Sequence, residues 1–397
     1  MEYTKGSALE GLKVLDLGRV IAAPFAAAML ADLGADVIKI EMPQGGDNAR
    51  DNLPMKDGES TYFIQFNRSK RGMTLDMKKG RDILVKLVEK ADVVLENFRP
   101  GVMEKLGFGY EELRKINPQI IMASVSGFGQ TGPYSQRAGY DPLAQAMSGM
   151  MDITGYPENP PVRAGASIAD VMAAQNAVIG VLAALEYRNK TGEGQYIDVS
   201  LLDATIVSMS SVVQGYLTDK SYIPTRRGNG YLAGAPGGLY ECKDGNLVLM
   251  ALGDRAWNKL VEVMDQKELL TDPRFETNQL RVANYPALDD IVNEWTRNFE
   301  VHELESLLLS NGLPAGAALT VPQMYENEHV NVREMFTTVN HPTIGDVEIT
   351  NQGIKMSKTS PYVRGSSPLL GEHTDEILKD LGYSDDEIAT FRAEGVI

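Results

Sequence analysis

The stretch "LKVLDLGRVIAAPFAAAMLADLGADVIKIE" (residues 12–41) decides the fold of this chain. An apolar run ends at Gly18, a segment of helix-forming residues begins near Pro24 and stops at Gly34, and a second apolar run, "ADVIKIE", follows. Proline is tolerated in the first turn of a helix, and glycine is common just past its end. The stretch therefore predicts a strand, a helix and a second strand.

The same alternation continues for about 90 residues beyond this stretch. Apolar runs typical of strands occur at residues 72–77, 92–98 and 119–129, and helical patterns lie between them at residues 79–91 and 109–117. Alternating strands and helices favour a parallel sheet with helices on both faces. We therefore expect an α/β domain.

Ligands of such sheets bind beyond the carboxyl ends of the strands. In this chain those ends are expected at residues 18–22, 41–43, 97–99 and 126–129. The first of them, "GRVIAAP", lacks the GxGxxG pattern that lets a backbone approach a dinucleotide pyrophosphate. Glu41 does follow the first turn at the spacing of a ribose-binding acid, but without the glycines we do not expect NAD.

The charge of the chain limits its partners. Its formal net charge is -16, which disfavours nucleic acid and anionic membrane surfaces as partners. An anionic ligand would need a local basic pocket. Basic residues near the expected strand ends are Arg68, Lys70, Arg71, Lys78, Lys79, Arg99 and Lys105. Each alone is typical of a solvated face, but together they could hold a phosphorylated ligand.

Metal binding and export are not indicated. His302, His329, His341 and His373 have no metal-ligand spacing, and the single cysteine, Cys242, cannot form an internal disulfide. The first residues lack the apolar segment of a signal peptide, and no apolar run predicts a membrane span. We expect a cytoplasmic enzyme without a metal.

A long helix is predicted over residues 170–189, and Asp170 stands at its start. Small residues recur along it, so another element is expected to pack closely against it. Asp170 has two interpretations: it caps the helix, or it carries out chemistry. Aspartate is a preferred cap. The residue three positions on is Ala173, however, so there is no reciprocal capping box.

The composition changes beyond residue 220. The glycine-rich segment "RRGNGYLAGAPGG" (residues 226–238) precedes "ECKDGNLVLMA" (residues 241–251), which predicts a β-hairpin, and amphipathic helices follow. This indicates a second, smaller α+β domain. Taken alone, the glycine-rich segment is typical of a flexible linker between domains.

Several motifs in this order and spacing carry a resemblance to a known family. They include the opening stretch extended to Leu9, "ADVVLENFRPGVMEKLGFGYEEL" (residues 91–113), "SGFGQTGPY" (residues 126–134), "KTGEGQYIDVSLLDA" (residues 190–204) and "LGEHTDEIL" (residues 370–378). Nearly the whole chain resembles the family III CoA-transferases, also called the CaiB/BaiF family.

The resemblance implies an interlocked homodimer of ring-like chains. A Rossmann-like large domain would combine residues 1–220 and 331–397, and residues 221–330 would form the inserted small domain with a glycine-rich lid at its start. Members of this family move CoA from an acyl-CoA thioester to a free carboxylic acid. Acyl-CoA is then a substrate, and no tightly bound cofactor is expected.

The resemblance also implies roles for individual residues. Asp170 would be the nucleophile, forming an aspartyl anhydride and an aspartyl-CoA thioester, and Asp141 would be a second acid near the site. Contacts to CoA are expected from Val20, Ile21, Ala22, Arg71, Leu75, Lys78, Asn97, Phe98, Arg99, Lys105 and Tyr140. Gly234, Gly237 and Gly238 are candidates for stabilising the oxyanion through their N–H groups.

Three other functions remain open at this point. Related α-methylacyl-CoA racemases carry a histidine where this chain has Tyr140, and a tyrosine is a poor second base. Formyl-CoA:oxalate transferases carry a glutamine in place of Ile21 and an unbroken glycine run in place of "GAPGG", so a larger or less polar acid is expected here. A protein that only binds CoA esters is the third alternative.

Overall fold

In a computed structural model that describes residues 3–397, the chain divides into two compact units. The larger unit holds the chain up to Met150, Arg163–Lys220 and Asn331–Ile397, and the smaller unit holds Met151–Val162 and Ser221–Val330. The sequence prediction had assigned residues 151–162 to the large domain. They belong to the smaller unit because its loop binds them: the Gly228 N–H donates to the Gly155 carbonyl at 2.9 Å.

The larger unit is built on a six-stranded parallel sheet, which confirms the predicted α/β class. Its strands are β1 (Lys13–Asp16), β2 (Asp36–Glu41), β5 (Arg71–Thr74), β6 (Val93–Glu96), β7 (Ile121–Ser126) and β8 (Tyr196–Ser200). Their order is β5-β2-β1-β6-β7-β8. The order reverses between β1 and β6, where doubly wound sheets open a ligand crevice at their carboxyl ends.

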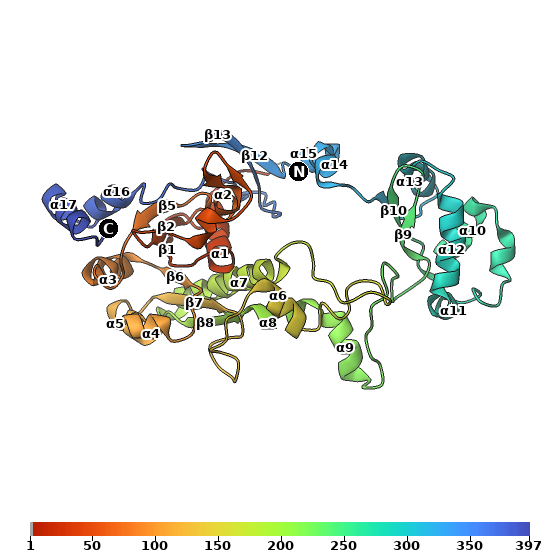
Figure 1. Cartoon of the computed structure of the whole chain (residues 1–397), viewed down its shortest axis with the longest axis horizontal. Coiled ribbons are helices and arrows are strands. Elements are labelled where there is room, and N and C mark those ends of the chain that lie inside the picture. Colours follow the sequence, from red (N-terminus) through yellow and green to blue (C-terminus); the bar gives the residue numbers. More distant parts are fainter. Residues whose placement is uncertain (1–2) are drawn as a thin grey trace. The chain divides into compact units, whose positions relative to one another are not determined.

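Helices cover both faces of this sheet (Figure 1). The core on one face includes residues of α1 (Ala22–Asp32) and α7 (Ile168–Thr191). The core on the other face includes residues of α3 (Arg81–Lys90) and α5 (Tyr110–Ile116). The C-terminal helices α16 (Thr374–Asp380) and α17 (Asp385–Ala393) add Ile377, Leu378 and Ile388 to this second core.

Close packing of α7 against α1 confirms what its small residues predicted. Ala173 and Ala177 of α7, like Ala26 and Ala27 of α1, are fully buried. The α7 helix is nevertheless long and apolar enough to cross a membrane by length and composition alone, which the sequence analysis had not noticed. A core helix passes the same test, and 44% of the apolar window of α7 is buried.

Shorter elements complete the larger unit. They are η1 (Asn48–Asp51), β3 (Met55–Lys56), β4 (Glu59–Ser60), α2 (Thr61–Asn67), α4 (Val102–Leu106), α6 (Asp141–Met147), α8 (Leu201–Ser208), α9 (Ser210–Thr218), and the hairpin of β12 (Phe336–His341) and β13 (Gly345–Thr350). Of these, α2 and α6 supply residues to the candidate site.

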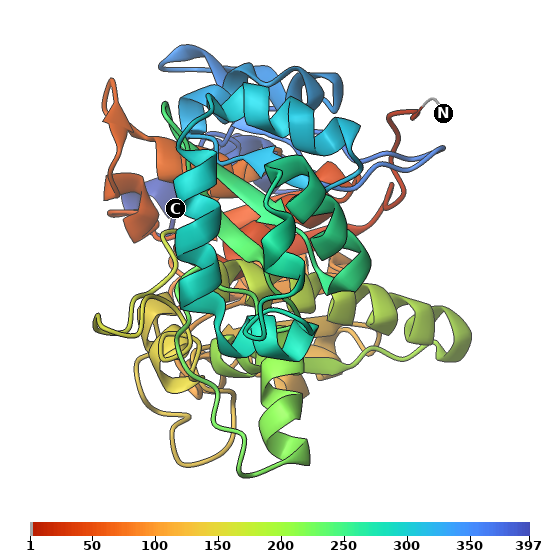
Figure 2. The ribbon, with the colours of Figure 1, turned by 90° about the vertical axis from the view of Figure 1, so that its right-hand side faces the viewer.

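The smaller unit contains an antiparallel sheet with helices packed on it (Figure 2). Its elements are β9 (Gly237–Glu241), β10 (Asn246–Met250), β11 (Ala315–Ala317), α10 (Gly253–Met264), η2 (Lys267–Leu270), α11 (Asn278–Ala283), α12 (Tyr285–Thr296), α13 (Val301–Ser310) and α14 (Val321–Glu326), with α15 (Glu328–Val332) following. The predicted hairpin is β9–β10. Cys242 lies at its turn, half-buried against the core, and burial raises its pKa.

Candidate active site

Asp170 does not cap the helix that carries it. The α7 helix begins at Ile168, so Asp170 is its third residue, and the capping position belongs to Ser167, whose side chain makes no capping hydrogen bond. The cap comes from Asp141 instead. The N–H of Ala169 donates to Asp141 Oδ2 at 2.7 Å, and the N–H of Asp170 donates to the same oxygen at 3.4 Å. The capping interpretation of Asp170 is therefore wrong.

Asp141 is firmly held in this position. It is the first residue of α6 and only 4% exposed. Gln145, one turn later, donates from Nε2 to Asp141 Oδ1 at 2.6 Å and accepts the N–H of Ala164 at 2.9 Å. Both oxygens of Asp141 are thus engaged, and α6 fixes the start of α7.

The Asp170 carboxyl has an unusual electrostatic setting. Burial, and then the negative charge of Asp141, raise the pKa of Asp170 to about 7. Among residues 3–397, no lysine or arginine forms an ion pair with it. A carboxyl group that titrates near neutral pH, without a cation to quench it, is typical of a residue that reacts.

The sequence analysis missed Tyr62, a residue of α2 that belongs to this centre. Its hydroxyl forms a hydrogen bond with the side chain of Ser167. Burial and the charge of Asp170 raise its pKa to about 12, so the phenol keeps its proton at neutral pH. No sequence signal singles out this tyrosine, because "STYFIQF" (residues 60–66) has only the pattern of a partly buried helix.

The strand ends of the sheet surround a second feature, a hollow of about 420 Å³. It is lined by Arg19, Met42, Asp76, Met77, Lys78, Phe98, Val102 and Leu106. Lys78 and Phe98 were predicted to contact CoA, and the structure brings their segments together with the end of β1. Arg19 was not among the basic candidates, although it lies in the first expected strand-end segment.

The other predicted CoA contacts lie around this hollow. Asn97 binds the backbone of Arg19 through its side chain. Ile21, Ala22 and Leu75 are buried beneath the strand ends, Val20 is half-buried, and Arg99 and Lys105 are exposed. These exposed cations follow β6, at the same edge of the sheet as Lys78.

Three basic residues of the predicted set lie elsewhere. Arg68 is buried and pairs with Asp32 at 2.7 Å, and Lys70 is buried and pairs with Asp16 at 2.7 Å. Arg71 begins β5, and thus lies at the amino edge of the sheet, where it pairs with Asp36 and Glu376. The expectation of phosphate contacts from these three is corrected, since each cation already joins two segments of the fold.

The remaining predicted residues show mixed outcomes. Tyr140 precedes Asp141 directly and is 67% exposed. Gly237 and Gly238 are residues of β9 paired with Met250 and Leu249, so the expected lid of residues 228–238 ends before them. Gly234 lies just ahead of this strand and is buried.

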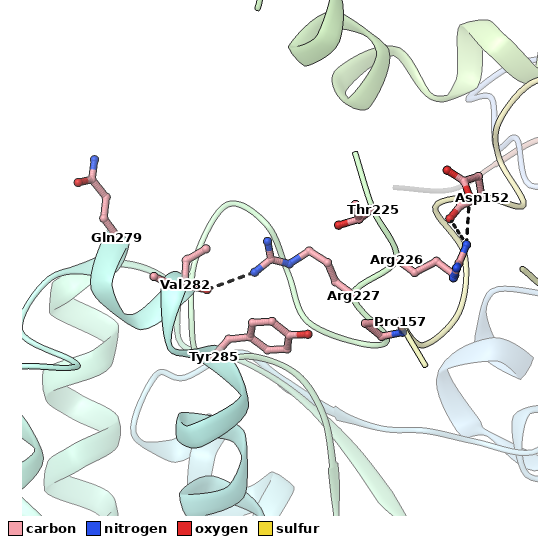
Figure 3. Close-up of a pocket in the computed structure, with 9 residues that line it drawn as sticks. Asp152, Pro157, Thr225, Arg226, Arg227, Gln279, Val282 and Tyr285 are labelled. Carbon is pink, nitrogen blue, oxygen red and sulfur yellow. Dashed lines mark hydrogen bonds and ion pairs between the residues drawn. The ribbon is translucent and has the colours of Figure 1, made fainter. Parts of the chain in front are cut away.

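A larger hollow of about 690 Å³ lies within the smaller unit (Figure 3). Arg226 and Arg227 line it, but their side chains point to opposite sides. Arg226 donates to Asp152, and Arg227 donates to the Val282 carbonyl and lies over the ring of Tyr285. No residue predicted for the site lines this hollow.

Metal ligands do not gather in the part of the chain that the structure describes, residues 3–397. The four histidines belong to separate elements: His302 to α13, His329 to α15 and His341 to β12, while His373 precedes α16. The candidate chemistry therefore rests on the carboxyl groups of Asp170 and Asp141 and on the strand-end hollow.

Comparison with known proteins decides the family. The chain matches CoA-transferase family III over residues 9–374. It belongs to this family. Succinyl-CoA–D-citramalate CoA-transferase of Chloroflexus aurantiacus is 38% identical over 98% of each chain. Succinyl-CoA:mesaconate CoA-transferase of Haloarcula hispanica is 38% identical over 94% of this chain and 96% of its own.

A solved structure agrees with this assignment. A CaiB/BaiF family protein from Brucella suis is 36% identical, covers 95% of this chain and 100% of its own, and superposes with a TM-score of 0.85. The protein is therefore a family III CoA-transferase that moves CoA from an acyl-CoA thioester to a free carboxylic acid. The racemase and pure-binding alternatives are not needed.

Proposed function

We propose that this CoA-transferase works through covalent catalysis by Asp170, with CoA bound at the carboxyl ends of β1 and β6. The observation that carries the proposal is the setting of Asp170. Its carboxyl lies in the first turn of α7, titrates near neutral pH and has no cationic partner among the described residues. The N-terminal end of a helix also favours the ionised carboxylate, which is the attacking form.

The reaction divides into steps that conserve the thioester's energy. The Asp170 carboxylate attacks the thioester carbonyl, the C–S bond breaks, and a mixed anhydride and CoA thiolate result. The thiolate attacks the aspartyl carbonyl, which releases the donor acid and leaves an aspartyl-CoA thioester. The acceptor carboxylate attacks this thioester to form a second anhydride, and the thiolate then takes the acceptor acyl group and frees Asp170.

Residues around Asp170 would support these steps. The protonated hydroxyl of Tyr62 is a hydrogen-bond donor near the reacting carboxyl. Asp141, by binding the first N–H groups of α7, would fix the orientation of Asp170. We assign the oxyanion donor to the segment around Gly234, because Gly237 and Gly238 are paired in β9.

We further propose succinyl-CoA as donor and a dicarboxylic acid as acceptor. The names of both relatives above pair succinyl-CoA with a dicarboxylate, citramalate or mesaconate. Ile21 supports this choice, since it is an apolar residue where the oxalate transferases carry a glutamine.

Exchange of CoA between acids tests the proposal. The enzyme is incubated with succinyl-CoA and a panel of mono- and dicarboxylic acids, and new thioesters are identified by mass spectrometry. Hydroxylamine added during turnover should modify the tryptic peptide of residues 164–188, which contains Asp170. Modification of residues 138–163, which contain Asp141, would contradict the assignment of the nucleophile.

We also propose the interlocked homodimer. Helices α6 to α9 expose large apolar side chains in the single chain, namely Leu143, Met147, Ile179, Leu182, Val207 and Leu217. Such a surface favours coverage by a second copy. Interlocked chains cannot separate without unthreading, so dilution in sedimentation velocity experiments should yield no folded monomer. A reversible, folded monomer would contradict the interlocked arrangement.

A further inference from the structure

The loop of residues 18–20, which joins β1 to α1, holds a strained residue. Val20 has a φ of 67°, in the left-handed region that β-branched residues rarely adopt. Such a conformation persists only where the surrounding structure enforces it, and it is common at functional sites. The loop also carries Arg19, whose guanidinium lies 5.7 Å from the ring centroid of Phe98 at the strand-end hollow.

Asp47 enforces this conformation from a buried position. The N–H of Val20 donates to Asp47 Oδ1 at 3.0 Å and to Oδ2 at 3.1 Å. Asp47 is 1% exposed and also accepts the N–H of Ala49 at 2.9 Å, as the cap of η1. Burial raises the pKa of Asp47, but the charge of Lys39 and these N–H groups outweigh burial and hold it below the usual value.

Lys39 connects Asp47 to the other end of the loop. Its ammonium group is fully buried, donates to Asp47 Oδ2 at 2.9 Å and donates to the carbonyl of Gly18. The residue between, Arg19, is fixed by Asn97, which accepts its N–H at 2.7 Å and donates to its carbonyl at 2.8 Å. Each residue of the loop therefore has a dedicated backbone partner.

We propose that Asp47, with Lys39, is a positioning residue for CoA: the pair holds Val20 in its left-handed conformation and so presents Arg19 to the nucleotide. The inference rests on the proposed CoA site. Neither side chain lines the hollow, so both act through the loop. Without the clamp, Val20 would relax to a negative φ, and CoA binding would have to restore the strained loop.

Calorimetric titration of CoA into the full chain measures this effect. Asp47→Asn removes the charge that binds Lys39 and weakens the acceptor of the Val20 N–H, so the Kd for CoA should rise about 10-fold, equivalent to about 1.4 kcal/mol. The KM for acyl-CoA should rise similarly, while kcat at saturation changes less than about twofold. Asp51→Asn, an exposed charge removal in the same segment, is the control and should bind CoA like the wild type.

A rescue separates positioning from general stability. Glycine adopts positive φ without steric cost, so adding Val20→Gly to Asp47→Asn should recover most of the lost affinity. Should Asp47→Asn fail to fold, Val20→Pro breaks the same hydrogen bond from the loop side and is expected to weaken binding as well.

The outcomes distinguish the two proposals. A wild type that binds no CoA overturns the proposed function and this inference with it. Wild-type binding together with unchanged affinity in a folded Asp47→Asn or Val20→Pro protein overturns the inference alone. A loss of affinity that Val20→Gly does not restore overturns it too, because an ion pair that only stabilises the fold gains nothing from the glycine.

Discussion

Two pairs of acids in the larger unit have opposite electrostatic surroundings. Asp16 and Asp47, near the end of β1, are buried with Lys39 between them, 3.9 Å from Asp16 and 2.9 Å from Asp47. Asp141 and Asp170, at the start of α7, have no such cation among residues 3–397. The pKa of Asp47 is lowered, whereas the pKa of Asp170 is raised to about 7.

The difference separates a structural carboxylate from a reactive one. A buried carboxylate with a paired ammonium group and backbone donors stays ionised and is spent on holding the backbone. A carboxylate whose nearest charge is another acid is costly to ionise, and that cost is released when it forms a bond to carbon. Three experiments break or sharpen this comparison.

Replacing Asp170 with asparagine should have the largest effect. The amide cannot form an anhydride, so exchange should fall by roughly 1000-fold or more while the protein stays folded. Asp203→Asn is the matched control, since Asp203 is also the third residue of its helix, α8, but is exposed. Near-normal exchange by Asp170→Asn, measured from thioester products, would remove the distinction between the two acid pairs.

Replacing Asp141 with asparagine should have an intermediate effect. The variant keeps an acceptor for the α7 N–H groups but loses the negative charge, which is the smaller of the two causes that raise the pKa of Asp170. We expect a loss in kcat of about 10-fold, from weaker positioning, and an acid limb of the kcat/KM profile that moves below pH 7. An acid limb that stays in place, or moves to higher pH, would show that Asp141 does not act on Asp170.

The stability of the Asp170→Asn variant should show the smallest effect. Because the pKa of Asp170 is raised in the folded state, the folded protein holds a proton that the unfolded chain loses above about pH 4. The wild type should therefore lose stability as pH rises from about 4 to 7, and the variant should not share this loss. Thermal unfolding should give a Tm a few °C higher for the variant at pH 8, and equal values near pH 4.

A variant that is no more stable at pH 8 would mean that Asp170 pays no cost for ionisation. Asp47→Asn gives the opposite reference. The pKa of Asp47 is lowered in the folded state, so its charge stabilises the protein above the pKa of the unfolded chain, and its removal should lower the Tm at pH 8.

Local sequence signals predicted the elements but not all their contacts. The strand–helix alternation gave the sheet and its crevice, because hydrophobic period and glycine stops are local properties. The basic residues were harder to interpret. Lys78 lines the hollow, whereas Arg68 and Lys70, a few positions earlier, are buried in ion pairs with Asp32 and Asp16, which are more than 30 positions away.

The sequence by itself determined the α/β class, the importance of Asp170 and, through its motifs, the family. Only the tertiary structure decided that Asp141 caps α7, that Tyr62 belongs to the centre, and that Lys39 and Asp47 hold Val20. The physical reason is that a cap, a pKa and a strained φ depend on groups brought together from distant positions. Sequence spacing reports only what neighbours along one helix or strand can do.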